Sequence, residues 1–214
     1  VRMLNPKGEE VSPSEFIAAA NDEGLTGKID RWVVLNSIKQ LGEHRSKGHN
    51  THLFIHLSSA SLQDQTFLPW LSLALKAERL PADALVMQIS EPDAIEYLKQ
   101  AKALTQGLAE LHCKVSINQF GCAANPFNTL KHINADFVRV DGSYTQDLAN
   151  PENLEALKVL LTSLHAQAQI TVVPCVETAT TMAALWQTGA NYIQGYFLQA
   201  PSPVMDFEFS SGND

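Results

Sequence analysis

The stretch KVSINQFGCAANP, residues 114–126, decides the fold class. An apolar run alternates into Asn118 and Gln119, and Phe120-Gly121 then lead into a turn of small residues, as in a barrel strand that ends in a loop. In an α/β barrel these loops carry the functional residues. Carboxylates at this strand end could hold a metal ion, whereas the two amides hold one poorly. These two side chains therefore bear on whether the protein is an enzyme.

Strand-like and helix-like segments alternate on both sides of this stretch. Strands are expected at 1–4, 51–59, 84–90, 114–118, 136–141, 170–174 and 191–195, and helices at 12–24, 29–42, 67–80, 91–112, 126–132, 151–167 and 178–188. Strands that are apolar on both faces are typical of a parallel sheet covered by helices. This regular alternation favours a (β/α)8-type barrel over an open sheet, with an eighth strand that is irregular or lies upstream of Val1.

Length and composition predict one α/β domain over residues 1–214. A chain of 214 residues with 45% hydrophobic composition can bury a sizeable core. Residues 208–214 are expected to form a flexible tail. Because the chain begins at Val1 without an initiator Met, we expect it to be the C-terminal part of a longer multidomain protein.

Charge and cysteine content narrow the class of function. A net charge of -8 argues against general binding to DNA or RNA, although a local pocket can still bind a small anion. Cys113, Cys122 and Cys175 show no disulfide or metal-binding spacing and are expected to be structural thiols in a reducing compartment. No apolar run is long enough to span a membrane, so we expect a cytoplasmic protein with no membrane insertion.

Seven short motifs, in order and at the right spacing, resemble one family. They are SPSEFIAAANDEGLTGKIDRWV (12–33), HLSSASL (56–62), QISE (88–91), INQFG (117–121), VRVDGSY (138–144), VPCVET (173–178) and QGYFLQAP (194–201). They resemble the EAL motifs P-x-x-F-I-x-x-A-E-x-x-G-L-I-x-x-I-D-x-W-V, N-L-S-x-x-x-L, E-I-T-E, D-D-F-G, L-K-I-D-x-S-F, A-E-G-V-E-T and Q-G-Y. The resemblance implies a TIM-like (β/α)8 barrel of the bacterial cyclic di-GMP phosphodiesterases. The family's signature Glu is expected upstream of Val1.

The departures from these motifs fall on the family's chemistry. Active members resemble one another in holding two divalent cations with Asn, Glu and Asp side chains and in using a Lys to assist the attacking water. The corresponding residues here are His56, Gln88, Asn118, Gln119, Arg139 and Pro174. Neutral amides are weak Mg²⁺ ligands, and a guanidinium stays protonated. The resemblance therefore implies a degenerate domain with no bound metal and no catalytic residue.

Positions that match the family's nucleotide contacts are kept. The resemblance assigns a phosphate contact to Arg2, a guanine-edge contact to Asp30, and further cyclic di-GMP contacts to Glu177, Gln194, Phe197 and Pro201. A carboxylate about 4 Å from a phosphate would repel it by about 1 kcal/mol in water and about 4 kcal/mol at an effective dielectric of 20. Amides remove that repulsion, so we expect binding of cyclic di-GMP without a cofactor.

Other interpretations of these residues stay open at this stage. Asp30 and Glu177 could simply be acidic residues at helix starts, Arg2 could be a surface residue, Asp141 could brace a loop, and Phe197 could belong to the core. His56 is expected to be a hydrogen-bonded strand-end histidine rather than a metal ligand.

Three functions compete. The leading one is a cyclic di-GMP receptor that relays the signal to protein partners. The pattern of kept and lost residues most resembles a degenerate EAL protein that regulates type IV pili and twitching motility and docks a PilZ-domain protein. Alternatives are a weak phosphodiesterase, with a residual metal on Glu91, Asp141, Glu177 and the upstream Glu, and a scaffold that has lost its ligand.

Overall fold

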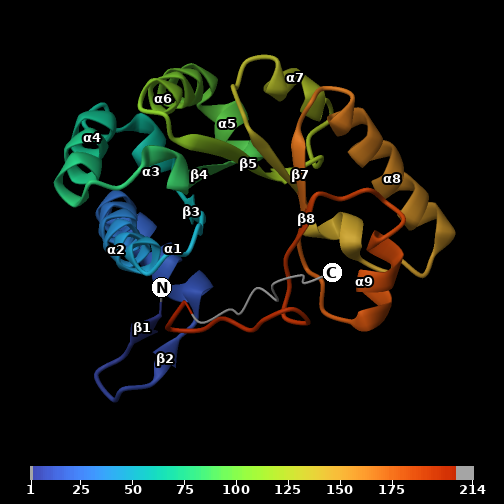
Figure 1. Ribbon diagram of the computed structural model, residues 1–214, viewed down its shortest axis with the longest axis horizontal. Helices are drawn as coiled ribbons and strands as arrows, with labels where there is room; N and C mark the ends of the chain where they lie inside the picture. The colour runs from blue at the N-terminus through green and yellow to red at the C-terminus, as the bar shows by residue number, and fades with distance from the viewer. Residues whose placement is uncertain (1, 206–214) are drawn as a thin grey trace. The chain divides into compact units, whose positions relative to one another are not determined.

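The structure is a computed structural model that describes residues 2–205 (Figure 1). These residues form two compact units, one made of residues 2–117 and 125–135 and the other of residues 118–124 and 136–205. The expected tail at 208–214 lies outside the described residues. The prediction that residues 1–214 form one domain of a longer protein stays a prediction.

The first unit alternates helices with parallel strands after a short hairpin. Its elements are β1 (Met3–Leu4), β2 (Glu10–Val11), α1 (Pro13–Asp22), α2 (Thr26–Ser46), β3 (Leu53–His56), α3 (Ser59–Gln63), α4 (Phe67–Glu78), the 3-10 turn η1 (Ala82–Ala84), β4 (Leu85–Ser90), α5 (Glu91–Glu96), α6 (Leu98–Glu110), the start of β5 (Lys114–Phe120) and α7 (Pro126–Leu130). Strands β3 and β4 pair in parallel, so that His56 lies opposite Gln88 where the pairing ends.

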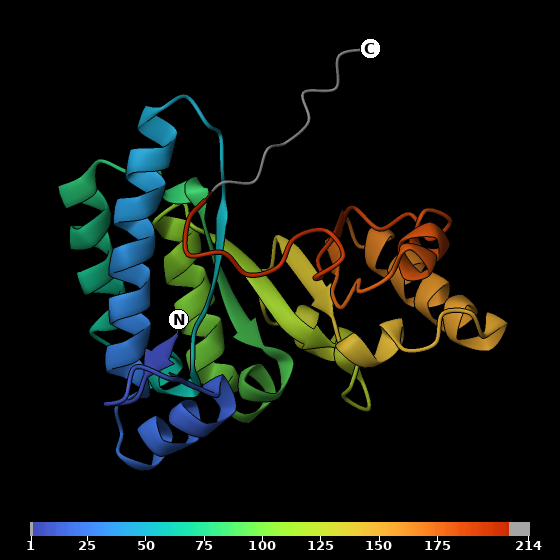
Figure 2. The same ribbon diagram turned by 90° about the horizontal axis from the view of Figure 1, so that it is seen from below.

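Helix α2 packs on this sheet through one face. Its buried residues, Thr26, Asp30, Val34, Ile38 and Leu41, follow one another at intervals of three or four and so form a single stripe. Figure 2 shows α2 running alongside β3. The stripe is apolar except at Thr26 and Asp30, so the helix carries one carboxylate into the interior of the unit.

The second unit repeats the parallel arrangement. It contains the end of β5, β6 (Phe137–Val140), the 3-10 turn η2 (Gly142–Thr145), α8 (Pro151–His165), β7 (Ile170–Val173), α9 (Ala179–Leu185) and β8 (Tyr192–Ile193). Strands β6, β7 and β8 pair in parallel in that order. Helix α8 begins at an Asn150 cap that accepts a hydrogen bond from the Glu152 amide, and the helix, whose buried residues are all leucines, contacts β7 (Figure 1).

Four local features differ from the sequence-based prediction. The opening strand pairs antiparallel with Glu10–Val11 and is not part of the parallel sheet. The helix expected over 91–112 is interrupted at Tyr97 (φ -113°, ψ 44°). Helix α3 was not expected, and β5 extends to Phe120, so Asn118 and Gln119 lie inside the strand.

Within residues 2–205, no helix is both long and apolar enough to span a membrane.

Candidate functional site

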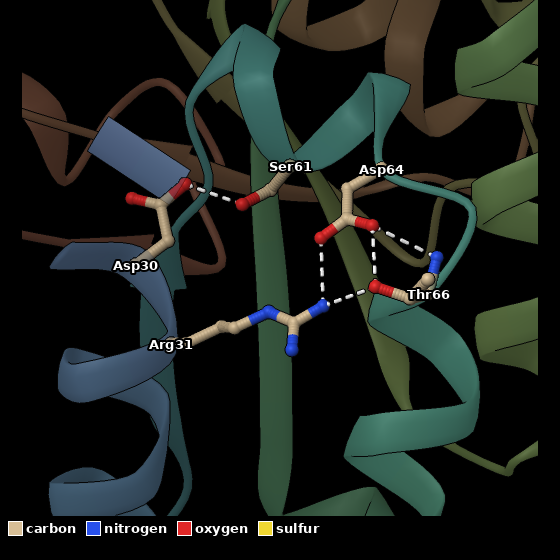
Figure 3. Close-up of polar contacts among 5 residues, drawn as sticks. All are labelled: Asp30, Arg31, Ser61, Asp64 and Thr66. Carbon is tan, nitrogen blue, oxygen red and sulfur yellow. Dashed lines mark hydrogen bonds and ion pairs between the residues drawn. The ribbon is translucent and has the colours of Figure 1, made fainter. Parts of the chain in front are cut away.

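Asp30 anchors a dense group of hydrogen bonds in the first unit. Its Oδ2 accepts from the Ser58 amide at 2.8 Å, from the Ser58 hydroxyl at 2.6 Å and from the Ser61 hydroxyl at 2.6 Å. Figure 3 shows Asp30 on α2 directed at Ser61. The side chain is 8% exposed, and its second oxygen, Oδ1, takes no part in these bonds. Asp30 therefore ties α2 to the turn that follows β3.

His56 and Gln88 lie next to each other at the ends of their strands. The register pairs the two residues, and the Leu57 amide donates to the Gln88 carbonyl at 2.8 Å. Gln88 Nε2 is 3.4 Å from Ser116 Oγ, at the long end of the hydrogen-bond range, whereas His56 is exposed. The two side chains give this strand edge a polar character without a carboxylate.

Arg2 lies on the exposed segment that leads into β1. Its Nη1 is 3.7 Å from Glu10 Oε2, and both side chains are about half exposed or more. Arg2 also lines an open pocket of about 350 Å³ together with Lys28 and apolar side chains that include Trp32. An exposed ion pair of this length contributes little, so the guanidinium can exchange Glu10 for another anion.

Arg139 is the hub of the second unit's polar residues. Its Nε donates to Gln194 Oε1 at 3.1 Å, and its Nη1 donates to Asn118 Oδ1. Burial lowers the pKa of Arg139, and the nearby Cys175 and Asp141 act in the opposite direction. A guanidinium remains protonated even when its pKa falls moderately. Arg139, from β6, is therefore a permanent cation held between a residue of β5 and a residue of the segment after β8.

Gln119 has a left-handed backbone inside β5. Its φ is +55°, and its amide donates to Asn118 Oδ1 at 2.8 Å. The same Asn118 oxygen thus accepts from both Arg139 and Gln119. A positive φ in a strand residue other than Gly is uncommon and tends to mark functional sites.

The segment from Gln194 to Phe197 packs closely against Val176. A Cβ added at Gly195 would lie 2.0 Å from the Val176 carbonyl oxygen, so only glycine fits there. The Val176 amide donates to the Gln194 carbonyl at 2.9 Å, and the Phe197 amide donates to the Val176 carbonyl at 3.1 Å. Phe197 is 46% exposed and is not a core residue, and Pro201 is also exposed.

Pro174 and Glu177 differ sharply in exposure. Pro174 is buried and offers no side-chain donor or acceptor, whereas Glu177 is exposed. Glu177 lies before Thr178, which caps α9 by accepting from the Thr181 amide at 3.1 Å, so the carboxylate stands outside the helix.

Asp141 shapes the loop after β6. It accepts from the Ser143 amide at 2.9 Å, and this hydrogen bond is the main cause that lowers its pKa. This geometry matches the interpretation of Asp141 as a residue that braces the loop.

The donor set at the family's metal positions does not fit a pair of Mg²⁺ ions. Mg²⁺ needs several oxygen ligands, preferably anionic, in octahedral geometry. Asn118 Oδ1 is already engaged by Arg139, whose charge opposes a second cation, and Pro174 supplies no ligand atom. Within residues 2–205, no three His, Cys, Asp or Glu side chains are grouped to hold a metal ion. Glu91, at the start of α5, is buried.

Sequence reasoning singled out Asp30 and Arg139 as candidate residues but did not predict their hydrogen-bond partners. The hydroxyls of Ser58 and Ser61 lie three residues apart after β3, and Gln194 is 55 positions away from Arg139. The spacing of Ser58 and Ser61 is a weak signal that the two hydroxyls share one acceptor. No local sequence pattern predicts the contact between Arg139 and Gln194, which are 55 positions apart.

Comparisons with known proteins agree on one family. A profile of the EAL domain matches residues 1–201. The FimX EAL domain from Pseudomonas aeruginosa bound to c-di-GMP is 60% identical with a TM-score of 0.93, covering 98% of this chain and 84% of that chain. The Xanthomonas citri FimX EAL domain in complex with c-diGMP is 30% identical with a TM-score of 0.89, covering 94% of this chain and 80% of that chain.

Among curated proteins, the cyclic di-GMP phosphodiesterase PdeF of Escherichia coli is 28% identical over 96% of this chain. The chain spans only 28% of PdeF and 26% of the Bacillus subtilis signaling protein YkoW. The structural matches confirm the predicted α/β fold of the EAL barrel type and the likeness to a degenerate member. The chain belongs to the EAL domain family.

Proposed function

We propose that this EAL domain is a receptor that binds cyclic di-GMP without a metal ion and without hydrolysing it. The observation that carries the proposal is the Arg139 hub, in which a guanidinium is bound by the amide oxygens of Asn118 and Gln194. The ligand has two phosphate charges, and this hub supplies a permanent positive charge at the position of the family's Lys.

The electrostatics favour an anionic ligand over metal chemistry. Metal-assisted cleavage uses bound cations to generate hydroxide and to stabilise the leaving oxygen. In the second unit, positions 118, 119 and 174 have no carboxylate to attract such cations, and Arg139 cannot act as a base. The same absence of carboxylates removes a repulsion of about 1–4 kcal/mol from a bound phosphate.

Each unit contains proposed ligand contacts of its own. In the first unit, Arg2 would meet a phosphate and Asp30 a guanine edge. In the second, the proposed ligand contacts are Glu177, Gln194, Phe197 and Pro201. Exposed Phe197 offers an aromatic face on which a base can stack. Support for this ligand also comes from FimX EAL domains, which have been crystallised with c-di-GMP.

The proposed cellular role rests on the 60% sequence identity to the FimX EAL domain. We propose that the domain acts in the cytoplasm, relays nucleotide binding to protein partners that include a PilZ-domain protein, and serves type IV pilus and twitching-motility regulation. The test is a titration of the full protein with purified PilZ-domain protein, with and without cyclic di-GMP.

Calorimetric titration with cyclic di-GMP in excess chelator tests the central proposal. The affinity is expected to be the same in chelator and in Mg²⁺, and to fall in Arg2→Ala. Lys102→Ala, which removes an exposed cation from α6, is the matched control and should bind normally. Loss of binding in chelator would contradict the proposal, and unchanged affinity in both Arg2→Ala and Asp30→Ala would favour the ligand-free scaffold.

A weak phosphodiesterase is the second candidate, because curated relatives such as PdeF bear that name and because Glu91, Asp141 and Glu177 are present. Incubation with Mg²⁺ or Mn²⁺ followed by chromatography separates the two functions. Linear dinucleotide that accumulates beyond one equivalent of protein indicates an enzyme, whereas intact ligand supports the receptor.

A further inference from the structure

Two adjacent residues of α2 hold the two ends of the short helix α3 (Figure 3). At the first end, Asp30 Oδ2 accepts from Ser58 and Ser61. At the other end, Arg31 Nη2 donates to Asp64 Oδ2 at 2.7 Å and to Thr66 Oγ1 at 2.6 Å. A helix of five residues is too short to be stable alone, so these contacts from α2 fix its position.

Ser58 uses its hydroxyl in an unusual way for its position. It stands at the N-cap of α3 with extended backbone angles, yet its side chain accepts no hydrogen bond from the helix. Instead, both its hydroxyl and its amide donate to Asp30 Oδ2. An N-cap serine ordinarily accepts a hydrogen bond from its own helix. Here the Ser58 hydroxyl instead donates to a carboxylate on the neighbouring helix α2.

The three donors leave Asp30 with one available oxygen. Each carboxylate oxygen has about two lone-pair sites, and Oδ2 already accepts three hydrogen bonds. Ser61 is 1% exposed and Asp30 is 8% exposed, so the carboxylate cannot turn without breaking these bonds in a buried setting. A further donor can therefore approach only Oδ1.

We infer that Ser58 and Ser61 are positioning residues for base recognition: they occupy Oδ2 and hold Asp30 so that Oδ1 is the single acceptor presented to the guanine edge. The inference rests on the proposed function, since it concerns how that ligand is read. Guanine carries its ring N–H and exocyclic amine on its Watson–Crick edge, and a carboxylate held in a fixed orientation discriminates better than one free to rotate.

The test measures cyclic di-GMP affinity in chelator for four proteins. Ser61→Ala removes one donor to Oδ2 and is expected to weaken binding by about 3- to 10-fold. Ser61→Thr keeps the hydroxyl and should bind within about 2-fold of wild type. Arg31→Ala is the matched control, because it releases the other end of α3 without touching Asp30. It should lower the melting temperature but leave the affinity within about 2-fold.

A double-mutant cycle shows whether Ser61 acts through Asp30. In an Asp30→Ala background, Ser61→Ala should cause no further loss of affinity, because the group that it positions is gone. Additive losses would overturn the inference, as would unchanged affinity in Ser61→Ala or equal losses in Ser61→Ala and Arg31→Ala. If the wild-type protein does not bind cyclic di-GMP at all, the proposed function fails first, which distinguishes that failure from failure of the inference.

Discussion

The two units hold opposite charges by the same means. In the first, the Asp30 carboxylate is bound by two hydroxyls and an amide, and in the second, the Arg139 guanidinium is bound by two amide oxygens. Within residues 2–205, neither Asp30 nor Arg139 forms an ion pair, in contrast to Arg31 and Asp64, which pair at 2.7 Å. Neutral hydrogen-bond partners orient a charged group without neutralising it, whereas the partner in an ion pair neutralises the charge. Charges held by neutral groups remain available to a ligand.

The hydrogen-bonded groups around Asp30 (the first centre) and Arg139 (the second centre) differ in the segments of chain that support them. Asp30 is 8% exposed and its donors come from one turn of chain, residues 58–61. Arg139 is half-buried, and its acceptors come from β5 and from the segment after β8, where Gln194 directly precedes the close approach of Gly195 to Val176. The first centre is therefore sensitive to loss of single hydrogen bonds, and the second to displacement of backbone.

Gly195→Ala should have the largest effect, because it breaks the second centre at its backbone. The added Cβ would lie 2.0 Å from the Val176 carbonyl oxygen. Overpacking against rigid backbone should cost about 3 kcal/mol. For a chain of this size, that corresponds to a melting temperature about 6–12 °C lower. Differential scanning calorimetry measures the shift.

Gly42→Ala is the matched control for that experiment. Gly42 lies in α2, and a Cβ there meets no atom within 4 Å. Alanine should raise helix stability by about 0.5–1 kcal/mol. A Gly195→Ala protein that melts with the wild type would show that the segment after β8 can move, and that the Arg139 hub does not depend on it.

Asp30→Ala should have the next largest effect, because it breaks the first centre. The buried Ser61 hydroxyl and the Ser58 amide would lose their acceptor. The expected loss is about 2–3 kcal/mol in the free energy of unfolding, measured by urea denaturation. Asp30→Asn keeps an acceptor and should lose less. Equal stability of Asp30→Ala and wild type would contradict the view that this carboxylate organises α3.

Arg139→Gln sharpens the comparison by separating binding from stability. The guanidinium has neutral partners, so its loss should change the free energy of unfolding by less than about 1 kcal/mol. Cyclic di-GMP affinity should fall about 10-fold, because a charge-assisted contact is lost. Calorimetry at low and high salt measures this loss. Lys158→Gln removes a cation from α8 in the same unit and should leave the affinity unchanged. A larger effect on stability than on binding would assign Arg139 a structural role.

The sequence allowed the parallel strands and the longer helices to be predicted, because their periodic apolar residues are a local signal. Helix α3 was missed for a physical reason: SASLQ has no helical period of its own, and the segment is fixed by Asp30 and Arg31 from α2. The positive φ of Gln119 could not be predicted from the sequence either, since glutamine has no preference for a left-handed conformation.

The candidate site was predictable to the same extent. Motif positions identify which residue types are kept or lost, as at Asn118 and Arg139. The pairing of those two side chains with each other depends on the end of β5 and β6 lying in one unit, and no pattern within either motif specifies it.

Asp64→Asn should have the smallest effect and depends on pH. The Thr66 hydroxyl, and after it Arg31, lower the pKa of Asp64 below its usual value. A lowered folded-state pKa stabilises the protein above the unfolded value of about 3.9, and this contribution is lost as the pH falls through the folded-state pKa. Both side chains are about 30% exposed, so solvent screening limits the contribution to less than about 1 kcal/mol. Urea denaturation should therefore show a gap between wild type and Asp64→Asn at pH 7 that narrows below about pH 4.

The exposed Asp22, at the end of α1, provides the control for that measurement, since Asp22→Asn should leave the pH dependence unchanged. Cyclic di-GMP affinity at pH 7 should be the same in Asp64→Asn as in wild type, because this charge is already neutralised by Arg31. If Asp64→Asn instead weakened binding as much as Ser61→Ala, the paired charge would contribute to ligand recognition as the Asp30 charge does. The distinction between charges that pair with each other and charges that neutral groups hold for a ligand would then fail within the first unit itself.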